Sequence, residues 1–430
     1  MATVSAYPAL QRLESLSVRG MKLGLAAIDA LCQRLGRPER QVPSILIAGT
    51  NGKGSTAATL SAIARAGGLK AGLYTSPHLV DVTERIRIEE REISEGELDE
   101  ALSRVFRTAE AAPEIPATYF EALTAAAFLL FAERRLDLAI LEVGLGGRFD
   151  ATNVTSPELS VVTSISLDHT EELGPTIGAI AREKAGIFRR SRPALVESPR
   201  EEALQAFRDV ALETGAFLHE MSAEVSLEVE EPSLEQTRFR LRTPERSYEL
   251  TTPLLGQHQA WNAAAAVRAA ELLPATWQID ESAVARGVSA VRWPGRLEKF
   301  LVRGHPVYLD GCHNPDGAAS LALFLARTGL AGDLIFGAMA DKDIAAMAAV
   351  LSEVVGEIRL VPVSSPRAAI PAELKRRLSP WCPDAVESPG LVQALEEFLS
   401  RPGDKPIIVA GSLYLVGQAR ALLVGEKIGE

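Results

Sequence analysis

The first half of the chain alternates short apolar runs with longer stretches of helical periodicity. An apolar run at Ser44–Ala48 enters a glycine-rich turn, and a helix-forming stretch from Ser55 to Ala66 and a second apolar run at Lys70–Thr75 follow. A strand, a crossover helix and a second strand form a βαβ unit, which places the two strands in one parallel sheet. The pattern predicts further elements of this sheet domain at Leu138–Glu142, Ser160–Ser164 and the helix Phe120–Glu133.

The pattern changes between about residues 225 and 250, where apolar and polar positions alternate in short segments. Such alternation predicts antiparallel strands, which we expect to be appended to the main sheet. The segments are Val225–Val229, Arg238–Arg242 and Ser247–Leu250. A long helix is predicted to follow them at Gln259–Leu273.

A second α/β pattern begins after the Pro294–Gly295 pair, which is a strong break in regular structure. We therefore expect two domains, 1–292 and 293–430. Strands of the second domain are predicted at Val307–Asp310, Leu334–Gly337, Ile358–Val361 and Ile407–Gly411. The predicted fold class is α/β, with a larger N-terminal P-loop-type domain on a mostly parallel sheet with an antiparallel appendage. A smaller Rossmann-like α/β domain completes it at the C-terminal end.

Composition narrows the functional class. With 430 residues, 47% hydrophobic and 23% charged, the chain has the make-up of a globular enzyme of two domains. A net charge of -11 argues against general nucleic-acid binding, which needs clustered Lys and Arg. The longest apolar run, Ala122–Ala132, is too short to span a bilayer. No secretory signal is visible and the three cysteines form no metal or disulfide pattern, so we expect a cytoplasmic location. We also expect a monomer that acts on small molecules.

The glycine-rich turn Gly49–Ser55 carries the first chemical signal. Glycines between a strand and a helix let backbone N–H groups surround an anion at the positive end of the helix. Lys53 would add a positive charge at the terminal phosphates, and Ser55 a hydroxyl. The spacing departs from the G-x-x-x-x-G-K-[ST] loop, because position 47 is Ile and Gly54 separates Lys53 from Ser55. The alternative is that the glycines only make a tight turn.

Other candidates are more ambiguous on their own. Glu142 ends an apolar strand, and a carboxylate at that edge of a parallel sheet is well placed to hold Mg²⁺, although a solvated strand-end Glu is the alternative. A lone histidine such as His169 is more often structural than a ligand. Lys184, on a predicted helix from Thr176 to Gly186, would by default be a surface lysine. Asn262 opens a helix and could be only a cap.

Several stretches, taken together and in order, resemble the Mur ligase superfamily and within it the folylpolyglutamate synthase and dihydrofolate synthase family. The loop Gly49–Ser55 resembles the phosphate loop of that family, because its spacing differs from the common phosphate loop in the same way. The other matching blocks are Thr75–Leu79, Thr83–Ile86, Glu142–Arg148, Asp150–Asn153, Asp168–Thr170, Glu183–Ile187, Pro294–Arg296, Asp310–Pro315, Asp341–Asp343 and Gly411–Ser412. The resemblance covers both expected domains.

The resemblance implies a metal site and a modified lysine. It assigns Ser76, Glu142 and His169 to one Mg²⁺, although histidine is an unusual ligand for that ion. It also implies that Lys184 is carbamylated by CO₂ and, as a carboxylate-like anion, holds a second Mg²⁺. Lys53, Lys184 and His169 are thus the expected catalytic residues. The expected cofactors are ATP and Mg²⁺, with Mg²⁺ at two sites. A monovalent cation is a further candidate cofactor.

The resemblance also implies two substrate sites. The expected ATP-binding residues are Thr50, Asn51, Gly52, Lys53, Gly54, Ser55, Asn262, Arg296, Asp310 and His313. The expected pterin or folate residues are Met21, Lys22, Leu23, Gly24, Ala117, Thr118, Tyr119, Phe120, Phe149, Asp150 and Ala151. Tyr119 and Phe120 offer an aromatic face for a flat heterocycle, with an aromatic pair capping a helix as the alternative. The chain departs from the family's pattern at Ala26–Ala27 and at Cys312.

The activity implied is ATP-dependent addition of L-glutamate to dihydropteroate, a reduced folate or both, through an acyl phosphate, and we expect a bifunctional enzyme. A monofunctional folylpolyglutamate synthase differs only in the pterin site. A peptidoglycan Mur ligase would share the ATP site, but Thr75–Leu79 and Ala117–Phe120 favour a folate. A nucleotide-binding protein without catalysis is disfavoured by the presence of four residues, Lys53, Glu142, His169 and Lys184.

Overall fold

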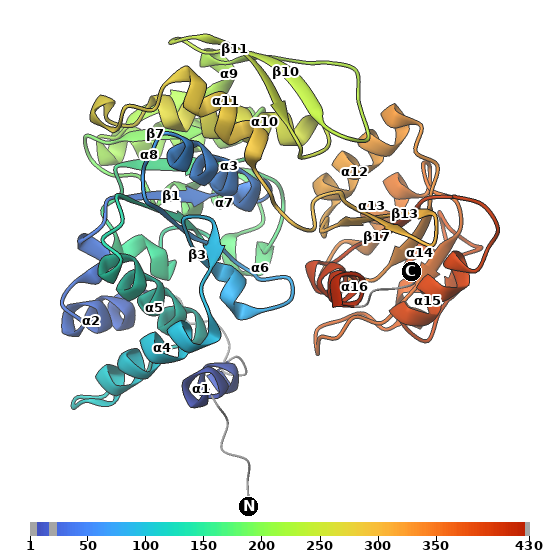
Figure 1. The fold of residues 1–430 in the computed structure, drawn as a ribbon, viewed down its shortest axis with the longest axis horizontal. Helices are drawn as coiled ribbons and strands as arrows, with labels where there is room; N and C mark the ends of the chain where they lie inside the picture. Colours follow the sequence, from blue (N-terminus) through green and yellow to red (C-terminus); the bar gives the residue numbers. More distant parts are fainter. Residues whose placement is uncertain (1–6, 17–23, 426–430) are drawn as a thin grey trace, which may run out of the picture.

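The larger domain is built on an eight-stranded sheet, which most of the first half of the chain forms (Figure 1). This computed structural model describes residues 7–16 and 24–425. The strand order is β4 (Arg91–Glu92), β3 (Ile86–Ile88), β2 (Ala71–Tyr74), β5 (Leu138–Glu142), β1 (Ser44–Ala48), β6 (Leu159–Val162), β7 (Pro193–Val196) and β8 (Phe217–Glu220). From β2 to β8 the pairing is parallel, and only the β3–β4 edge is antiparallel.

Helices cover both faces of this sheet, as its fully buried strands require. One face carries α1 (Pro8–Leu16), α2 (Ala26–Arg34), α4 (Glu95–Glu110), α5 (Tyr119–Glu133), α7 (Ile177–Ala185) and α8 (Glu201–Thr214). The other carries α3 (Lys53–Ala66), α10 (Gln257–Glu271) and α11 (Glu281–Ala290). Because the carboxyl ends of parallel strands share one edge, the loops after β1, β2, β5, β6 and β7 gather there.

The three alternating segments form strands, but they do not extend the main sheet. β9 (Ser226–Val229), β10 (Thr237–Arg242) and β11 (Ser247–Thr252) make a separate antiparallel sheet. The prediction that they are appended to the main sheet is therefore wrong in this respect. The buried positions of β10 and β11, such as Phe239 and Tyr248, pack with residues of α10 and α11. The small sheet thus covers helices that already cover the large one.

The smaller domain is a second, six-stranded α/β unit (Figure 1). Its order is β12 (Glu298–Val302), β13 (His305–Asp310), β17 (Ile407–Ala410), β14 (Asp333–Phe336), β15 (Ile358–Leu360) and β16 (Val386–Glu387). Only β12 is antiparallel. One face packs on α12 (Pro315–Thr328), α13 (Ile344–Leu351) and α14 (Pro371–Leu378), the other on α15 (Leu391–Leu399) and α16 (Leu413–Gly425).

The predicted α/β fold class, with a large mostly parallel sheet and a smaller α/β unit, is confirmed. The strands Ser44–Ala48 and Leu138–Glu142 were predicted with their observed bounds, and the bounds of the other predicted strands differ by one or two residues at an end. The strands that were not predicted are β3, β4, β7, β8, β12 and β16. Within the described ranges, no helix is both long and apolar enough to cross a membrane.

Candidate active site

The turn after β1 has a backbone that only glycines allow. Gly49 has φ of +148°, and a Cβ there would lie 1.8 Å from Oγ1 of Thr163, which directly follows the neighbouring strand β6. A Cβ on Gly54 would lie 2.8 Å from the indole of Trp293. The turn enters α3 through Gly52, which supplies no side-chain cap. Because Gly52 has no side chain, no capping group accepts from the first N–H groups of α3, which line the cleft. Free N–H groups at the start of a helix are the usual arrangement for binding phosphate.

Lys53 is the first residue of α3 and is half-buried, so it is not part of an exposed loop. Its Nζ donates to the carbonyl oxygens of Gly49 at 3.2 Å and Thr50 at 3.1 Å. These bonds hold the ammonium over the turn. A cation in that position adds its charge to the positive end of the helix.

Glu142 and Ser76 come together from neighbouring strands β5 and β2. The backbone N–H of Ser76 donates to Oε2 of Glu142 at 3.1 Å. Burial raises the pKa of Glu142, while nearby Lys53 opposes this rise. A buried carboxylate beside a hydroxyl-bearing residue, at the mouth of the phosphate turn, provides oxygen donors of the kind that Mg²⁺ prefers.

His169 lines the same cleft and has a left-handed backbone, with φ of 51°. Burial lowers the pKa of its imidazole, and the charge of Asp168 opposes the shift. The neutral ring is the form that coordinates metals. In the described part of the chain, no three His, Cys, Asp or Glu side chains gather as a ready-made metal cluster. A magnesium ion here would thus take a few protein ligands plus phosphate and water oxygens, its usual mode.

Lys184 is buried, with 5% of its surface exposed, so it is not the ordinary surface lysine that its helix suggests. It lies near the end of α7, where its Nζ donates to the carbonyl oxygen of Gly49 at 2.8 Å. Burial, together with the charge of Lys53, lowers the pKa of Lys184 to about 7. The lowered pKa makes the neutral amine more accessible near neutral pH, and a neutral amine is what reaction with CO₂ requires.

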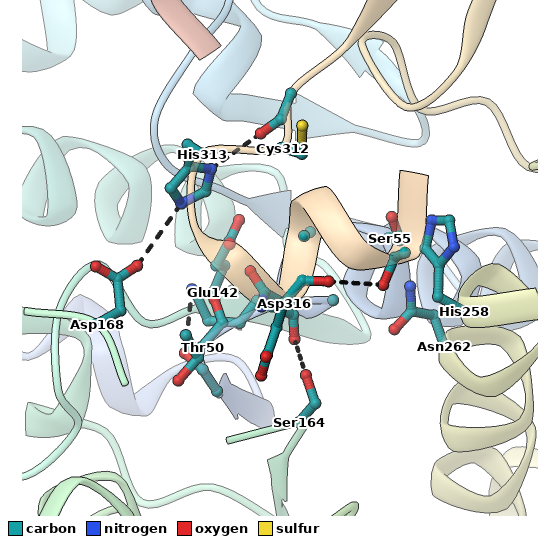
Figure 2. A pocket seen from close by; sticks show the side chains of 18 of the residues that line it. Thr50, Ser55, Glu142, Ser164, Asp168, His258, Asn262, Cys312, His313 and Asp316 are labelled. Atoms are coloured by element: carbon teal, nitrogen blue, oxygen red, sulfur yellow. Dashed lines mark hydrogen bonds and ion pairs between the residues drawn. The ribbon is translucent and has the colours of Figure 1, made fainter. Parts of the chain in front are cut away.

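The smaller domain supplies the opposite wall of the cleft, whose volume is about 460 Å³. Figure 2 shows His313 reaching from this domain toward Asp168 of the larger one. Nδ1 of His313 donates to the carbonyl oxygen of Gly311 at 2.9 Å, and burial lowers the pKa of His313 to about 4. The carboxylate of Asp310 accepts from the backbone N–H groups of Leu297 at 3.1 Å and Cys312 at 3.0 Å.

The structure brings all of the predicted ATP and metal residues to this one cleft. They are Thr50, Asn51, Gly52, Lys53, Gly54, Ser55, Ser76, Glu142, His169, Lys184, Asn262, Arg296, Asp310 and His313. They come from both domains and from loops that lie far apart in the sequence.

Contacts between the domains were missed as functional features. Lys342 places Nζ 2.5 Å from Oδ1 of Asp168. Asn314 donates to Oδ1 of Asn51 in the phosphate turn at 2.9 Å. All of these residues except Asn51 stand in matching blocks outside the phosphate turn, so the signal was present, but sequence alone does not show that those blocks meet.

The predicted pterin residues lie beside the cleft, and none of those the structure describes lines it. Met21, Lys22 and Leu23 fall outside the described residues. Phe120 packs against Gly144, where a Cβ would lie 2.7 Å from its ring, and it is 5.9 Å from the ring of Tyr74. Phe120 therefore stands next to the chain that follows Glu142.

Two of the predicted pterin residues, Thr118 and Asp150, accept hydrogen bonds that stabilise the local backbone. Thr118 caps α5, accepting from the backbone N–H of Glu121. Both carboxylate oxygens of Asp150 accept backbone N–H groups, of Gly144 and Leu145 at one oxygen and of Thr152 at the other. Ala151 follows Asp150 in a short 3₁₀ turn. Of the other predicted pterin residues, Gly24 and Ala117 are half-buried and Phe149 is 44% exposed.

A buried arginine beside this region was not predicted. Arg85 donates from Nε to Nδ1 of His78 at 3.0 Å, and its guanidinium lies 5.4 Å from the ring of Tyr119. The Thr83–Ile86 block contains it, but its spacing gives no hint of a cation next to an aromatic face. Such a cation suits an anionic group of a bound aromatic substrate.

Comparisons with known proteins agree with this geometry. Residues 47–270 match the Mur ligase middle domain, and residues 295–413 match the Mur ligase glutamate ligase domain. The dihydrofolate synthase/folylpolyglutamate synthase of Bacillus subtilis is 36% identical over 415 residues, covering 94% of this chain and 96% of that protein.

Solved structures of the same kind are also similar. FolC of Escherichia coli in complex with DHPP and ADP has a TM-score of 0.88 and 33% identity, covering 98% of both chains. A bifunctional folylpolyglutamate synthase/dihydrofolate synthase with Mn, AMPPNP and L-glutamate bound has a TM-score of 0.86 and 33% identity, covering 97% of this chain and 98% of that one.

Proposed function

The chain belongs to the dihydrofolate synthase/folylpolyglutamate synthase family of the Mur ligases, and from this premise we propose that it adds L-glutamate to dihydropteroate and to reduced folates using ATP. The observation that carries the proposal is the convergence of Lys53, Glu142 and Lys184 on one cleft between two domains. A nucleotide-binding protein without catalysis would not need a buried lysine with a lowered pKa beside the phosphate turn.

The phosphate turn and Lys53 would bind the triphosphate of ATP and orient its terminal phosphoryl group. Transfer of a phosphoryl group depends mainly on positioning and on stabilising charge. Glu142 and Ser76, with His169, would hold Mg²⁺, which when bound neutralises phosphate charge. The carboxylate of the pterin substrate attacks the γ-phosphorus and releases ADP, which gives an acyl phosphate. The amine of L-glutamate then attacks the acyl carbon, an amide forms and phosphate leaves.

The smaller domain would complete the nucleotide site. Asp310 is fixed by two backbone N–H groups, and Arg296 and His313 stand beside it in the cleft. Because the nucleotide site is shared, the two domains would close when both contact the nucleotide. Closure would exclude water, which would otherwise hydrolyse the acyl phosphate. We place the functional division at 1–292 and 293–430, because the strands of the six-stranded sheet begin at Glu298.

The pterin would lie beside Phe120 and Tyr119, on the side of the cleft that carries Arg85. An aromatic face suits a flat heterocycle, and Arg85 suits an anionic group of the substrate. A bifunctional enzyme follows from relatives that carry both names. A cytoplasmic location, where folate substrates and ATP occur, is part of the proposal.

The test is phosphate release from ATP with Mg²⁺ and L-glutamate plus either dihydropteroate or tetrahydrofolate. Release with each pterin, with the glutamylated product identified by mass, supports the bifunctional enzyme. Release with tetrahydrofolate alone would instead make it a monofunctional folylpolyglutamate synthase. Release with neither pterin would refute the folate assignment.

A further inference from the structure

Glu197 is a cleft residue that the proposed mechanism does not use. It follows β7 directly, and its backbone N–H donates to the carbonyl oxygen of Val162 at 2.8 Å. Across the sheet, Val196 pairs with Val162 and Val162 pairs with Ala48, the last residue of β1. Glu197 is therefore level with Gly49, the first residue of the phosphate turn. Two strand spacings place it about 10 Å to the side of the phosphate turn. Glu142 flanks the turn from the opposite side, on β5.

The carboxylate of Glu197 differs from the others that line the cleft. Its Oε2 is buried and has no hydrogen-bond partner among the residues that the structure describes. By contrast, Glu142 accepts from Ser76, Asp168 from Lys342 and Asp316 from Arg200. Burial alone raises the pKa of Glu197 to about 7. A buried acceptor without a partner is costly, so a donor from a ligand that enters the cleft would stabilise it.

The surroundings of Glu197 indicate which part of a ligand would supply this hydrogen-bond donor. Leu195, two residues earlier, packs in the core under α3 and α10, so Glu197 faces the same side of the sheet. The first turns of α10 bring His258, Gln259 and Asn262 to the same cleft, and Figure 2 shows His258 and Asn262 together. Neutral amide and imidazole groups predominate there. The cations Lys53 and Lys184 stand instead at the phosphate turn.

A nucleotide held by its phosphates at the turn must extend its base away from Glu142. A ribose and a base extend a nucleotide well beyond its phosphates, so the base would reach the region of Glu197 and the start of α10. We propose that Glu197 accepts a hydrogen bond from the exocyclic 6-amino group of the ATP base and thereby sets the preference of the enzyme for adenine nucleotides. This inference rests on the proposed function and assigns a specificity role within it.

The test removes each partner of this hydrogen bond in turn. Purine riboside 5′-triphosphate has hydrogen in place of the 6-amino group of ATP, so it lacks the donor. For the wild type, kcat/KM should fall about tenfold or more with this analogue, the size expected for a hydrogen bond to a charged group. For Glu197→Ala the two nucleotides should be used almost equally. Glu197→Gln keeps an accepting oxygen and should retain part of the preference.

Glu201→Gln is the matched control, because Glu201 begins the helix after the same loop and pairs with Arg208 on the surface. It should discriminate between the nucleotides as the wild type does. If Glu197→Ala keeps the full discrimination, the inference is overturned. It is also overturned if this variant changes only the KM of L-glutamate, since the carboxylate would then serve the amino group of that substrate.

Direct binding separates this inference from the proposed function. Calorimetric titration of ATP and of the analogue, each with Mg²⁺, gives the same comparison without turnover. A wild type that binds ATP more tightly than the analogue, with that difference lost in Glu197→Ala, supports the role of Glu197 even if no pterin is glutamylated. Equal binding of both nucleotides by the wild type would overturn it, whatever the ligase assay shows.

Discussion

Lys342 of the smaller domain places its ammonium nitrogen 2.5 Å from a carboxylate oxygen of Asp168 in the larger domain. Both side chains are nearly buried, at 10% and 8% exposure. Asn314 donates to the other oxygen of Asp168 at 3.3 Å, and His313 lies 3.8 Å from it. Asp168 also accepts the backbone N–H of His169. The contact that joins the domains is therefore continuous with the loop that carries a predicted metal ligand.

This relationship predicts that Lys342→Met favours the open arrangement of the domains. Asp168 would lose its partner, and a nearly buried carboxylate without a partner is costly, so the domains would separate to hydrate it. We expect kcat to fall at least about tenfold, with a smaller change in the KM of ATP. Small-angle scattering with a non-hydrolysable ATP analogue should give a larger radius of gyration than for the wild type.

Lys342→Arg keeps the charge and serves as the conservative control, with most of the activity retained. Asp168→Asn combined with Lys342→Met should cost less than the sum of the single changes, because no unpaired charge is left. Strictly additive losses together with an unchanged radius of gyration would show that the contact does not control closure.

Lys53→Ala should abolish turnover while leaving the fold intact. The ammonium donates to two carbonyl oxygens of the phosphate turn, and the side chain is half-buried rather than part of the core. The expected change in the free energy of unfolding is within about 1 kcal/mol. Stopped or continuous phosphate-release assays measure the first effect and denaturant unfolding the second. Normal turnover by this variant would mean that the role of the turn has been misinterpreted.

Much of the fold could be predicted because parallel strands buried on both faces leave a strong sequence signal. Ser44–Ala48 and Leu138–Glu142 are continuous apolar runs, and both are strands with those bounds. The strands β9 to β11 alternate, so their existence was predictable. Their partner was not, because alternation shows that one face is covered but not whether a sheet or a helix covers it.

The site could be predicted only where residues stand next to one another in the chain. The phosphate turn is contiguous, and its glycines are required locally. Lys184 looks like any helical lysine, and its burial depends on the packing of α7 under Gly49, which no local pattern encodes. The unpaired carboxylate of Glu197 and the Lys342–Asp168 contact depend likewise on tertiary structure. Lys342 and Asp168 stand in matching blocks, but the sequence does not show that those blocks meet.

Phe120→Ala should weaken pterin substrates more than ATP. Phe120 stands beside Gly144, at the edge of the cleft rather than among its nucleotide residues. Loss of an aromatic stacking face costs on the order of 1–3 kcal/mol by analogy with bases stacked on aromatics, so the KM of dihydropteroate should rise about tenfold or more. Steady-state kinetics with each substrate varied in turn measures this. A raised KM for ATP with an unchanged KM for the pterin would place Phe120 on the nucleotide side.

Lys184 is expected to act as a carbamate, so charge and not only size should decide which variants work. Lys184→Ala should be nearly inactive, and short carboxylates added to the assay should restore part of the activity by filling the vacated space. Lys184→Arg keeps a positive charge but stays protonated, so it forms no carbamate and should be as poor as Lys184→Ala. Full activity of Lys184→Arg would show that a cation is what the site needs. The mass of the native enzyme, measured with and without ¹³CO₂, checks the modification itself.

The buried amine of Lys184 should also make the stability of the enzyme depend on pH in a defined direction. Its pKa is about 7 in the folded chain and 10.5 as a free side chain, so between these values the unfolded chain binds more protons than the folded one. Stability must therefore rise with pH in this window, because the cost of burying a charged amine disappears as the folded amine loses its proton.

Lys184→Met removes the titrating amine, so the difference in stability between the wild type and this variant separates the contribution of Lys184 from that of other titrating residues. In CO₂-free buffer, the free energy of unfolding of the wild type relative to Lys184→Met should increase by about 2 kcal/mol from pH 7 to pH 9. Denaturant unfolding of both proteins at each pH measures this, and a difference that stays constant across the window would mean that Lys184 remains charged in the folded protein.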